Sequence, residues 1–278
     1  MGFLILLVAV LMTESLGPLN GSLGDRWIVG WKGWLAGQPL LAGRSRLLHV
    51  LTLLVPVALL ALVLEVCGGW LFGLVGLVLN LLVLRYAFGR DGMAITQYRD
   101  TLARGDVQAA WHEAGQLVDW ESDPRADSWP ALHDQGLAAV AYRCFERYFP
   151  VMFWFVVLGL PGALFYRLSS LVAADGEGED GAIDRQLVWV LEWVPLRLLG
   201  PVLALMGNFS AAMRAWRETL FAVDESSAQV LVGVVRSALL TEASPSPDES
   251  AREVDAVRAL FRRALIFTLG LIALIELL

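Results

Sequence analysis

Charged residues and cysteines are scarce in this sequence. Of 278 residues, 18% are Asp, Glu, Lys or Arg, and there are two cysteines, Cys67 and Cys144. Neither cysteine has the neighbours of a zinc site, and we expect no disulfide between them. The net charge of −7 argues against nucleic acid as a partner, because phosphate binding needs a basic face.

Motifs for nucleotide binding and nucleophilic catalysis are also missing. There is no G-x-x-x-x-G-K-[ST] loop, no G-x-G-x-x-G after a predicted strand, and no nucleophile elbow. His49, His112 and His133 are scattered and form no ligand set with acidic residues. We therefore predict no catalytic residues, no metal site and no cofactor.

Long apolar blocks are abundant instead. Hydrophobic residues make up 57% of the chain, and a bilayer crossing needs about 20 mostly apolar residues. Residues 47–66, 69–88 and 148–173 meet this requirement. Residues 187–206 are apolar but contain two prolines, so a full span, a broken helix and a re-entrant segment all remain open. We predict an all-α class, a polytopic transmembrane helix bundle with helical cytoplasmic loops.

The two ends of the chain carry shorter apolar stretches. Residues 3–12 lack the preceding basic residue and the cleavage site of a signal peptide, so we expect a retained helix. Residues 264–278 form the expected last span. Gly159 and Pro161 predict a kink in the third long block, and Asp106 is expected to cap a helix in the loop before it.

Arginine distribution predicts the sides of the membrane. Arg44 and Arg46 precede the block 47–66, and further arginines gather in 89–147 and 207–256, whereas the acidic connector 175–180 has none. The positive-inside rule places the arginine-bearing regions in the cytoplasm and the connector outside. We expect a single membrane domain, 1–278, in a bacterial inner membrane. Its parts are an N-terminal helix and interfacial segment at 1–46, a transmembrane hairpin at 47–88, a cytoplasmic helical loop at 89–147, a kinked span, acidic connector and broken helix at 148–206, cytoplasmic helices and a linker at 207–256, and a C-terminal span at 257–278.

Ionisable side chains at membrane depth are costly and are therefore candidates for function. Glu14, Arg167, Glu192 and Arg197 fall in or beside the apolar blocks. The alternative for the arginines is snorkelling or a structural ion pair, and for Glu14 a helix end at headgroup level. Glu192 and Arg197 are five residues apart, so we expect them to reach different partners, such as Arg167 or Glu14.

Two segments carry a family resemblance. Residues 149–167 contain Phe-Pro-Val-Met-Phe-Trp and Gly-Leu-Pro-Gly-Ala-Leu-Phe-Tyr-Arg, and residues 191–198 read Leu-Glu-Trp-Val-Pro-Leu-Arg-Leu. Both resemble the membrane family that contains AmpE and the cobalamin-biosynthesis protein CobD/CbiB. The order of blocks extends the resemblance over nearly the whole chain, and the AmpE branch fits best. Of the matching positions, Tyr166, Arg167 and Arg197 are the ones that can touch a ligand.

The sequence departs from the cobalamin branch at polar positions. Its Asn-Thr-Leu-Asp run is replaced here by Leu168-Ser-Ser-Leu171, and its Ser-Pro-Asn-Ala-Gly motif is absent. These losses argue against amide-bond synthesis on a corrinoid. The resemblance implies instead an inner-membrane sensor or signalling component in the regulation of β-lactamase induction and cell-wall recycling.

Our leading hypothesis is a protein that binds a small anionic ligand between its helices, in a site drawn from Glu14, Tyr166, Arg167, Glu192 and Arg197. The expected partners are the lipid bilayer, a cell-wall-derived small molecule and a cytoplasmic protein, and the oligomeric state stays open. One alternative is a diverged ligase or transferase, for which the compact acidic set is Glu218, Asp224 and Glu225. A transporter is a third, although it predicts repeated broken helices.

Overall fold

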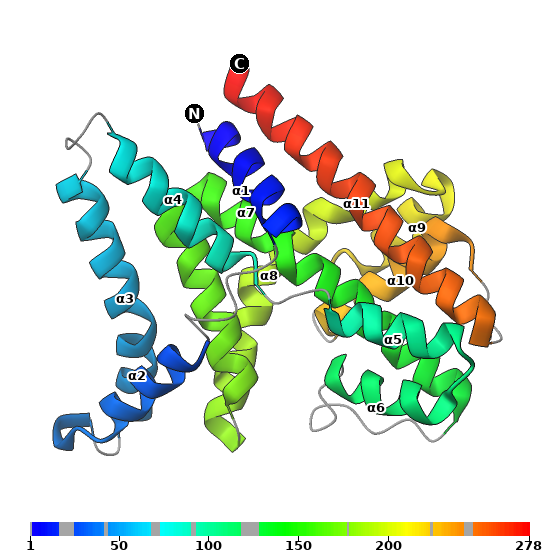
Figure 1. Ribbon diagram of the computed structural model, residues 1–278, viewed down its shortest axis with the longest axis horizontal. Coiled ribbons are helices and arrows are strands. Elements are labelled where there is room, and N and C mark those ends of the chain that lie inside the picture. The colour runs from blue at the N-terminus through cyan, green and yellow to red at the C-terminus, as the bar shows by residue number, and fades with distance from the viewer. Residues whose placement is uncertain are drawn as a thin grey trace. The chain divides into compact units, whose positions relative to one another are not determined.

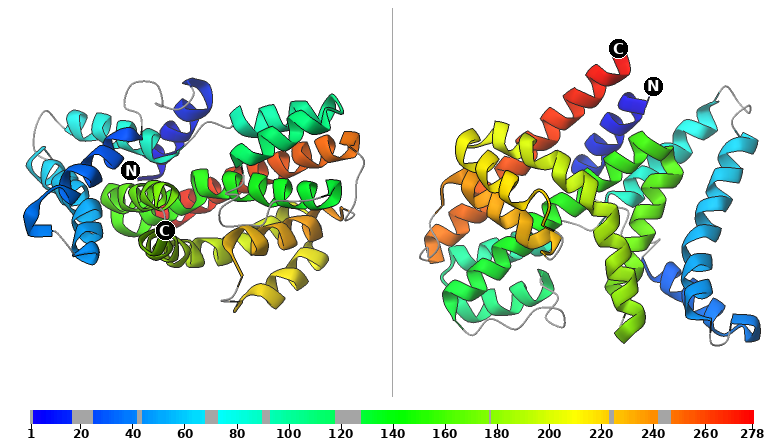
Figure 2. Two further views of the ribbon diagram at one scale, coloured as in Figure 1. Left: turned by 90° about the horizontal axis from the view of Figure 1, so that it is seen from below. Right: turned by 180° about the vertical axis from the view of Figure 1, so that it is seen from behind.

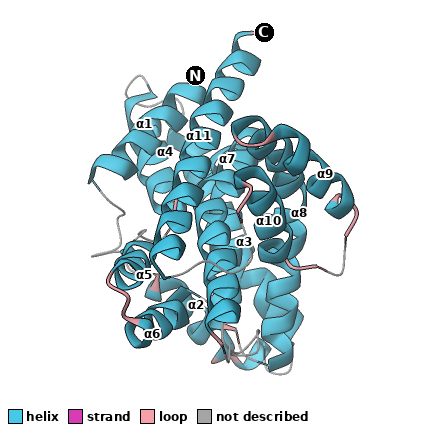
Figure 3. Cartoon of the chain, turned by 90° about the vertical axis from the view of Figure 1, so that its right-hand side faces the viewer, coloured by secondary structure: helices cyan, strands magenta, loops and turns pink. Residues whose placement is uncertain are grey.

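The computed structural model describes residues 2–16, 25–41, 44–67, 73–89, 93–117, 128–176, 178–222, 225–241 and 247–278. Every regular element in these ranges is a helix, which confirms the predicted all-α class (Figures 1 and 3). The elements are α1 Gly2–Leu16, α2 Arg26–Ala36, the 3-10 helix η1 Pro39–Leu41, α3 Ser45–Cys67, α4 Leu74–Ala87, α5 Met93–Ala103, α6 Val107–Leu117, α7 Trp129–Asp175, α8 Gly178–Met206, α9 Phe209–Thr219, α10 Ser227–Leu239 and α11 Pro247–Leu277.

Three helical stretches in the described ranges are long and apolar enough to cross a membrane. They are Leu47–Val66 within α3, Trp129–Asp175, and Gly181–Met206 within α8. The block predicted at 69–88 is a shorter helix, α4, and residues 69–72 lie outside the described residues. The block predicted at 264–278 is the end of α11, a longer helix that begins among charged residues.

Contacts divide the chain into two compact units. The first consists of Met1–Arg90, Arg147–Glu192 and Ile272–Leu278, and the second of Asp91–Glu146 and Trp193–Leu271. In the first unit, α1 packs along α4 and α2 packs along α3 (Figure 2). In the second, α5 packs on α6 and α9 on α10. The backbone N–H of Ala109 donates to the Asp106 carboxylate at 3.0 Å, which confirms the predicted cap of α6.

The predicted kink in the third long block is confirmed. Gly159 lies inside α7 with φ 69° and ψ −160°, a conformation open almost only to glycine. The Tyr148 ring lies 5.2 Å from the Phe88 ring, and a Cβ built on Gly89 would lie 3.1 Å from Nη1 of Arg167. A straight helix would separate residues 148 and 167 by about 28 Å. α7 therefore bends at Gly159, and Figure 1 shows the helix changing direction.

Residues 187–206, for which a full span, a broken helix and a re-entrant segment were left open, form part of one continuous helix, so the broken helix is wrong. α8 runs without interruption from Gly178 to Met206, through Pro195 and Pro201. Proline removes the N–H that would bond to the carbonyl four residues earlier, which for Pro195 is the carbonyl of Leu191. That oxygen accepts a hydrogen bond from Nε1 of Trp154 at 3.1 Å. A neighbouring helix thus restores the lost hydrogen bond, as membrane proteins require.

The starts of α3 and α8 lie at the same end of the first unit. Nε2 of His49, one turn into α3, is 3.2 Å from Oδ2 of Asp184, near the start of α8. The placement of Arg44 and Arg46 on the opposite side of the membrane from the connector 175–180 stays a prediction, and the contact between His49 and Asp184 gives a way to test it.

Candidate functional site

Arg167 lies on the second arm of α7 and is 4% exposed. Its Nη2 lies 3.4 and 3.3 Å from the two carboxylate oxygens of Asp25, just before α2. Charge-assisted hydrogen bonds are usually about 2.7–2.9 Å long, so this pairing is loose. Nε of Arg167 is buried and has no hydrogen-bond partner among the described residues. The guanidinium therefore has donors to offer to an anion.

Two neighbours shape the surroundings of Arg167. Gly89 has φ 72° and leaves room for the guanidinium, because a side chain there would meet Nη1. The Tyr86 hydroxyl accepts a hydrogen bond from Nε1 of Trp27 at 2.9 Å, so the first turn of α2 is held against the end of α4. Arg167 thus faces α2 and the end of α4, all within the first unit.

Tyr166 and Glu192 contact each other directly. The Tyr166 hydroxyl donates to Oε1 of Glu192 at 2.9 Å, and both side chains are buried. Successive residues on a helix point about 100° apart, so Tyr166 faces α8 while its neighbour Arg167 faces Asp25. Glu192 was expected to reach a partner other than Arg197, such as Arg167 or Glu14, and the contact seen is with Tyr166 instead.

Glu14 lies at the end of α1 and is bound to the first arm of α7. It accepts a short hydrogen bond from the Tyr148 hydroxyl, and Nη2 of Arg147 lies 3.5 Å from the same oxygen. Its side chain is 56% exposed. This arrangement resembles a helix end tied to its neighbour more than a ligand contact.

Arg197 has a different environment, in the second unit. Its guanidinium donates to the backbone oxygens of Leu220, Thr219 and Ala222 at 3.1, 3.3 and 2.8 Å. It also lies over the Trp193 ring, 4.9 Å from the ring centre. A cation is stabilised at the C-terminal end of a helix by the unpaired carbonyls there. The predicted pair of ligand-binding arginines is therefore served by two separate sets of partners.

The first unit also contains a buried ionic cluster that was not expected from the sequence. Asp184 is 3% exposed and lies 3.6 Å from Nζ of Lys32 and 3.2 Å from Nε2 of His49. The signal was present, because the apolar stretch of α8 begins at Gly181. Setting its start at residue 187 left Asp184 outside the predicted span. Asp25 gave no such signal, since it lies in a polar connection.

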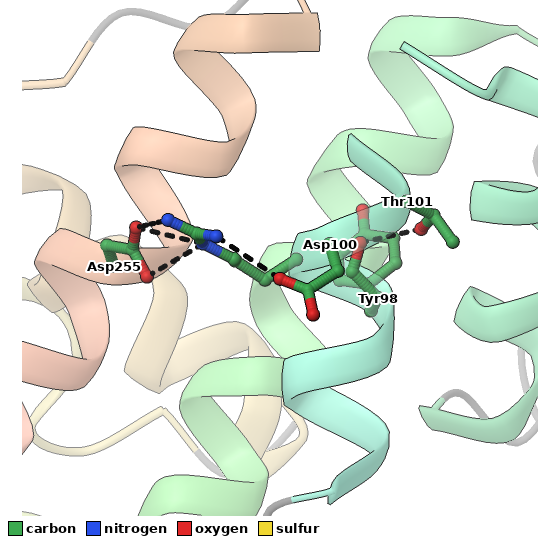
Figure 4. Close-up of polar contacts among 5 residues, drawn as sticks. Tyr98, Asp100, Thr101 and Asp255 are labelled. Atoms are coloured by element: carbon green, nitrogen blue, oxygen red, sulfur yellow. Dashed lines mark hydrogen bonds and ion pairs between the residues drawn. The ribbon is translucent and has the colours of Figure 1, made fainter. Parts of the chain in front are cut away.

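A second polar cluster joins the helices of the second unit. Nε2 of His133 on α7 lies 2.6 Å from Oε2 of Glu253 on α11, and both side chains are buried. Arg236 forms an ion pair with Asp134. Nearby, Arg99 binds Asp255 through two nitrogens and also contacts Asp100 (Figure 4). No group of three or more His, Cys, Asp or Glu side chains in the described ranges is placed to hold a metal ion.

Comparison with known proteins decides the family. Residues 5–278 match the family described as "AmpE: Regulatory signalling modulator protein AmpE". The chain belongs to the AmpE family. The resemblance seen in its sequence is thereby confirmed, and its apolar helices accord with the membrane location expected for an inner-membrane regulatory protein.

Curated relatives confirm the link to the cobalamin branch. A protein of Stutzerimonas stutzeri (strain A1501) called "Cobalamin biosynthesis protein CobD" is 29% identical over 193 residues, 63% of this chain and 60% of that protein. A protein of the same name from Chromobacterium violaceum is 29% identical over 125 residues, 43% of this chain and 39% of its own. The chain thus spans less than two thirds of these relatives. No solved structure matches it.

Proposed function

We propose that this AmpE-family protein is an inner-membrane signalling component that binds a small anionic ligand at Arg167. The observation that carries the proposal is the state of this side chain, which is buried, loosely paired with Asp25 and has an unpaired Nε. Membrane proteins rarely bury an arginine without using its charge. The ligand is a cell-wall-derived molecule, and its binding regulates β-lactamase induction.

Of the five site residues expected from the sequence, the contacts favour some over others as ligand-binding residues. Arg167 is its centre, and the buried Tyr166–Glu192 pair fixes the helix arm that carries Arg167. Glu14 and Arg197 serve helix packing, because each has partners that account for its charge. The arginine-bearing helices of the second unit face the cytoplasm in this proposal and contact a protein partner there.

The test is native mass spectrometry of protein extracted gently from its own membrane. Wild type is compared with Arg167→Gln, which removes the charge but keeps most of the volume. Arg99→Gln is the matched control, because it removes an arginine from an ion pair in the second unit (Figure 4). We expect a co-purifying small molecule in wild type and Arg99→Gln that is lost from Arg167→Gln. The same phospholipid alone in all three would overturn the proposal.

A cellular measurement checks the signalling role. Each of the two variants replaces the native copy in the host, and β-lactamase activity is measured in these strains and in wild type after exposure to a β-lactam. We expect Arg167→Gln to change the induced level, with Arg99→Gln at the wild-type level. Equal induction in all strains, including one without the protein, would contradict a role in this response.

The second candidate is a diverged ligase or transferase, which the CobD relatives favour. Its proposed acidic set is not a compact buried site, since Glu218 and Glu225 are exposed and Asp224 lies outside the described residues. The mass of the co-purifying molecule separates the two candidates. A nucleotide or corrinoid favours the enzyme, and an amino-sugar peptide favours the signalling protein.

A further inference from the structure

We propose that Asp25 is a built-in competitor for the Arg167 site, displaced by ligands that carry a carboxylate or phosphate group. This inference rests on the proposed function, because it concerns the same arginine. Asp25 places its carboxylate where the anionic group of a ligand has to bind. In the unliganded protein it partly neutralises a buried charge, and it leaves when a better partner arrives.

The geometry of the Arg167–Asp25 pair explains why a ligand can displace Asp25. Both oxygens of Asp25 contact a single nitrogen, Nη2 of Arg167, at 3.3 and 3.4 Å. A free carboxylate or phosphate prefers two parallel, shorter bonds to two nitrogens of a guanidinium. Nε of Arg167, which has no partner among the described residues, is available for the second bond. The Asp25 side chain is 25% exposed and that of Arg167 is 4% exposed, so the ion pair that a ligand has to break is reached by solvent from the side of Asp25.

The Asp25 carboxylate also has other hydrogen-bond donors within reach of its position in the chain. It occupies the position before the first turn of α2, where aspartate commonly accepts hydrogen bonds from the backbone N–H groups of the second or third helical residue. Here those residues are Trp27 and Ile28. Asp25 makes no such capping bond, and its backbone is helical, with φ −54° and ψ −8°. A change of ψ at this one residue moves the carboxylate from Arg167 to the end of α2.

The consequence of the exchange is a change in α2. This helix is linked to α4 through Trp27 and Tyr86, to α8 through Lys32 and Asp184, and it packs along α3. Its first turn gains a cap when the anion binds and loses the link to Arg167. Ligand binding is thereby converted into a change at a helix that contacts three others in the first unit.

Two substitutions at Asp25 separate the competing roles. Asp25→Asn removes the charge that pairs with Arg167 but keeps a residue that caps helices well, whereas Asp25→Ala removes both. Asp255→Asn is the control, because it takes a carboxylate from the Arg99 ion pair in the second unit. Each full-length protein is reconstituted in phosphatidylcholine nanodiscs. Binding of inorganic phosphate is measured by calorimetry, and protection of the α2 amides by hydrogen exchange.

We expect both Asp25 variants to bind phosphate about fivefold more tightly than wild type, because they lack the competing carboxylate. Phosphate should slow exchange in the first turn of α2 in wild type. Asp25→Asn should show that protection without phosphate, and Asp25→Ala should show none under either condition. If phosphatidylglycerol nanodiscs protect wild-type α2 and suppress phosphate binding, the displacing anion is a lipid headgroup.

The results that would overturn the competitor role of Asp25 differ from those that would remove the anion site at Arg167. Equal phosphate affinity in wild type and Asp25→Asn, with α2 exchange unchanged, overturns the competitor role of Asp25. If phosphate binding is at the same time abolished by Arg167→Gln, the anion site stands without it. Phosphate binding that Arg167→Gln leaves intact removes the site and the proposed function together.

Discussion

The indole N–H of Trp216 donates a hydrogen bond to the backbone oxygen of Arg197 at 3.0 Å. Pro201 stands four residues after Arg197 and has no N–H, so this oxygen lacks its usual partner within α8. Trp154 serves the oxygen left open by Pro195 in the same way. Two tryptophans from other helices therefore restore both hydrogen bonds that the prolines remove, and α8 remains one helix.

This relationship predicts that Trp216→Phe depends on Pro201. In the native background the substitution leaves a buried carbonyl unpaired and should lower stability by about 1–3 kcal/mol. In a Pro201→Ala background the alanine N–H takes that oxygen, so the same substitution should cost less. A double-mutant cycle of thermal unfolding in detergent measures the difference. Equal losses in the two backgrounds would show that the indole acts by packing alone.

The His133–Glu253 contact predicts an acid-sensitive second unit. Burial by itself raises the pKa of Glu253, but the contact with His133 and the neighbouring Thr241 and Arg236 outweigh it and lower the pKa below its usual value. A carboxylate whose pKa is lowered by folding stabilises the fold at pH values above its pKa in the unfolded chain, which is about 4.3 for Glu. That stabilisation is lost as pH falls through the folded value.

Glu253→Gln should therefore be less stable than wild type at pH 7, by about 1–3 kcal/mol. Its melting temperature should also fall less steeply than that of wild type as the pH is lowered below the unfolded value. Thermal unfolding across this range is the measurement, with the exposed Glu218→Gln as control. Parallel curves for wild type and Glu253→Gln would mean that this carboxylate has the same pKa folded and unfolded.

How much could be predicted from the sequence depends on how local each signal is. The apolar blocks, the kink at Gly159 and the Asp106 cap were predictable, because each depends on residues a few positions apart. The pairing of Arg167 with Asp25 was not, since it joins residues 142 positions apart, and the His133–Glu253 contact spans 120. Composition also does not distinguish an arginine with spare donors from one whose guanidinium binds carbonyls at the end of a helix, as that of Arg197 does.

The contact between His49 and Asp184 predicts that residues flanking α3 and α8 share one side of the membrane. Leu40→Cys and Asp175→Cys, each in a background without native cysteines, should react with a membrane-impermeant maleimide from the same side. Val66→Cys, at the other end of the apolar stretch of α3, should react from the opposite side, because α3 is about 34 Å long. Labelling of positions 40 and 175 from opposite faces would contradict this prediction and support the assignment made from the arginines.

Arg197 is predicted to stabilise the protein without binding the ligand. Its guanidinium is bound to three backbone oxygens at the end of α9, so Arg197→Gln removes these charge-assisted hydrogen bonds and should cost about 2–3 kcal/mol. The stability of Arg197→Lys should lie between that of wild type and that of Arg197→Gln, because an ammonium group cannot reproduce the guanidinium geometry. Thermal unfolding and native mass spectrometry on the same preparations check both properties. If Arg197→Gln loses a co-purifying anion but keeps its melting temperature, Arg197 is a ligand residue. If it keeps the anion but melts at a lower temperature, Arg167 remains the arginine of the site.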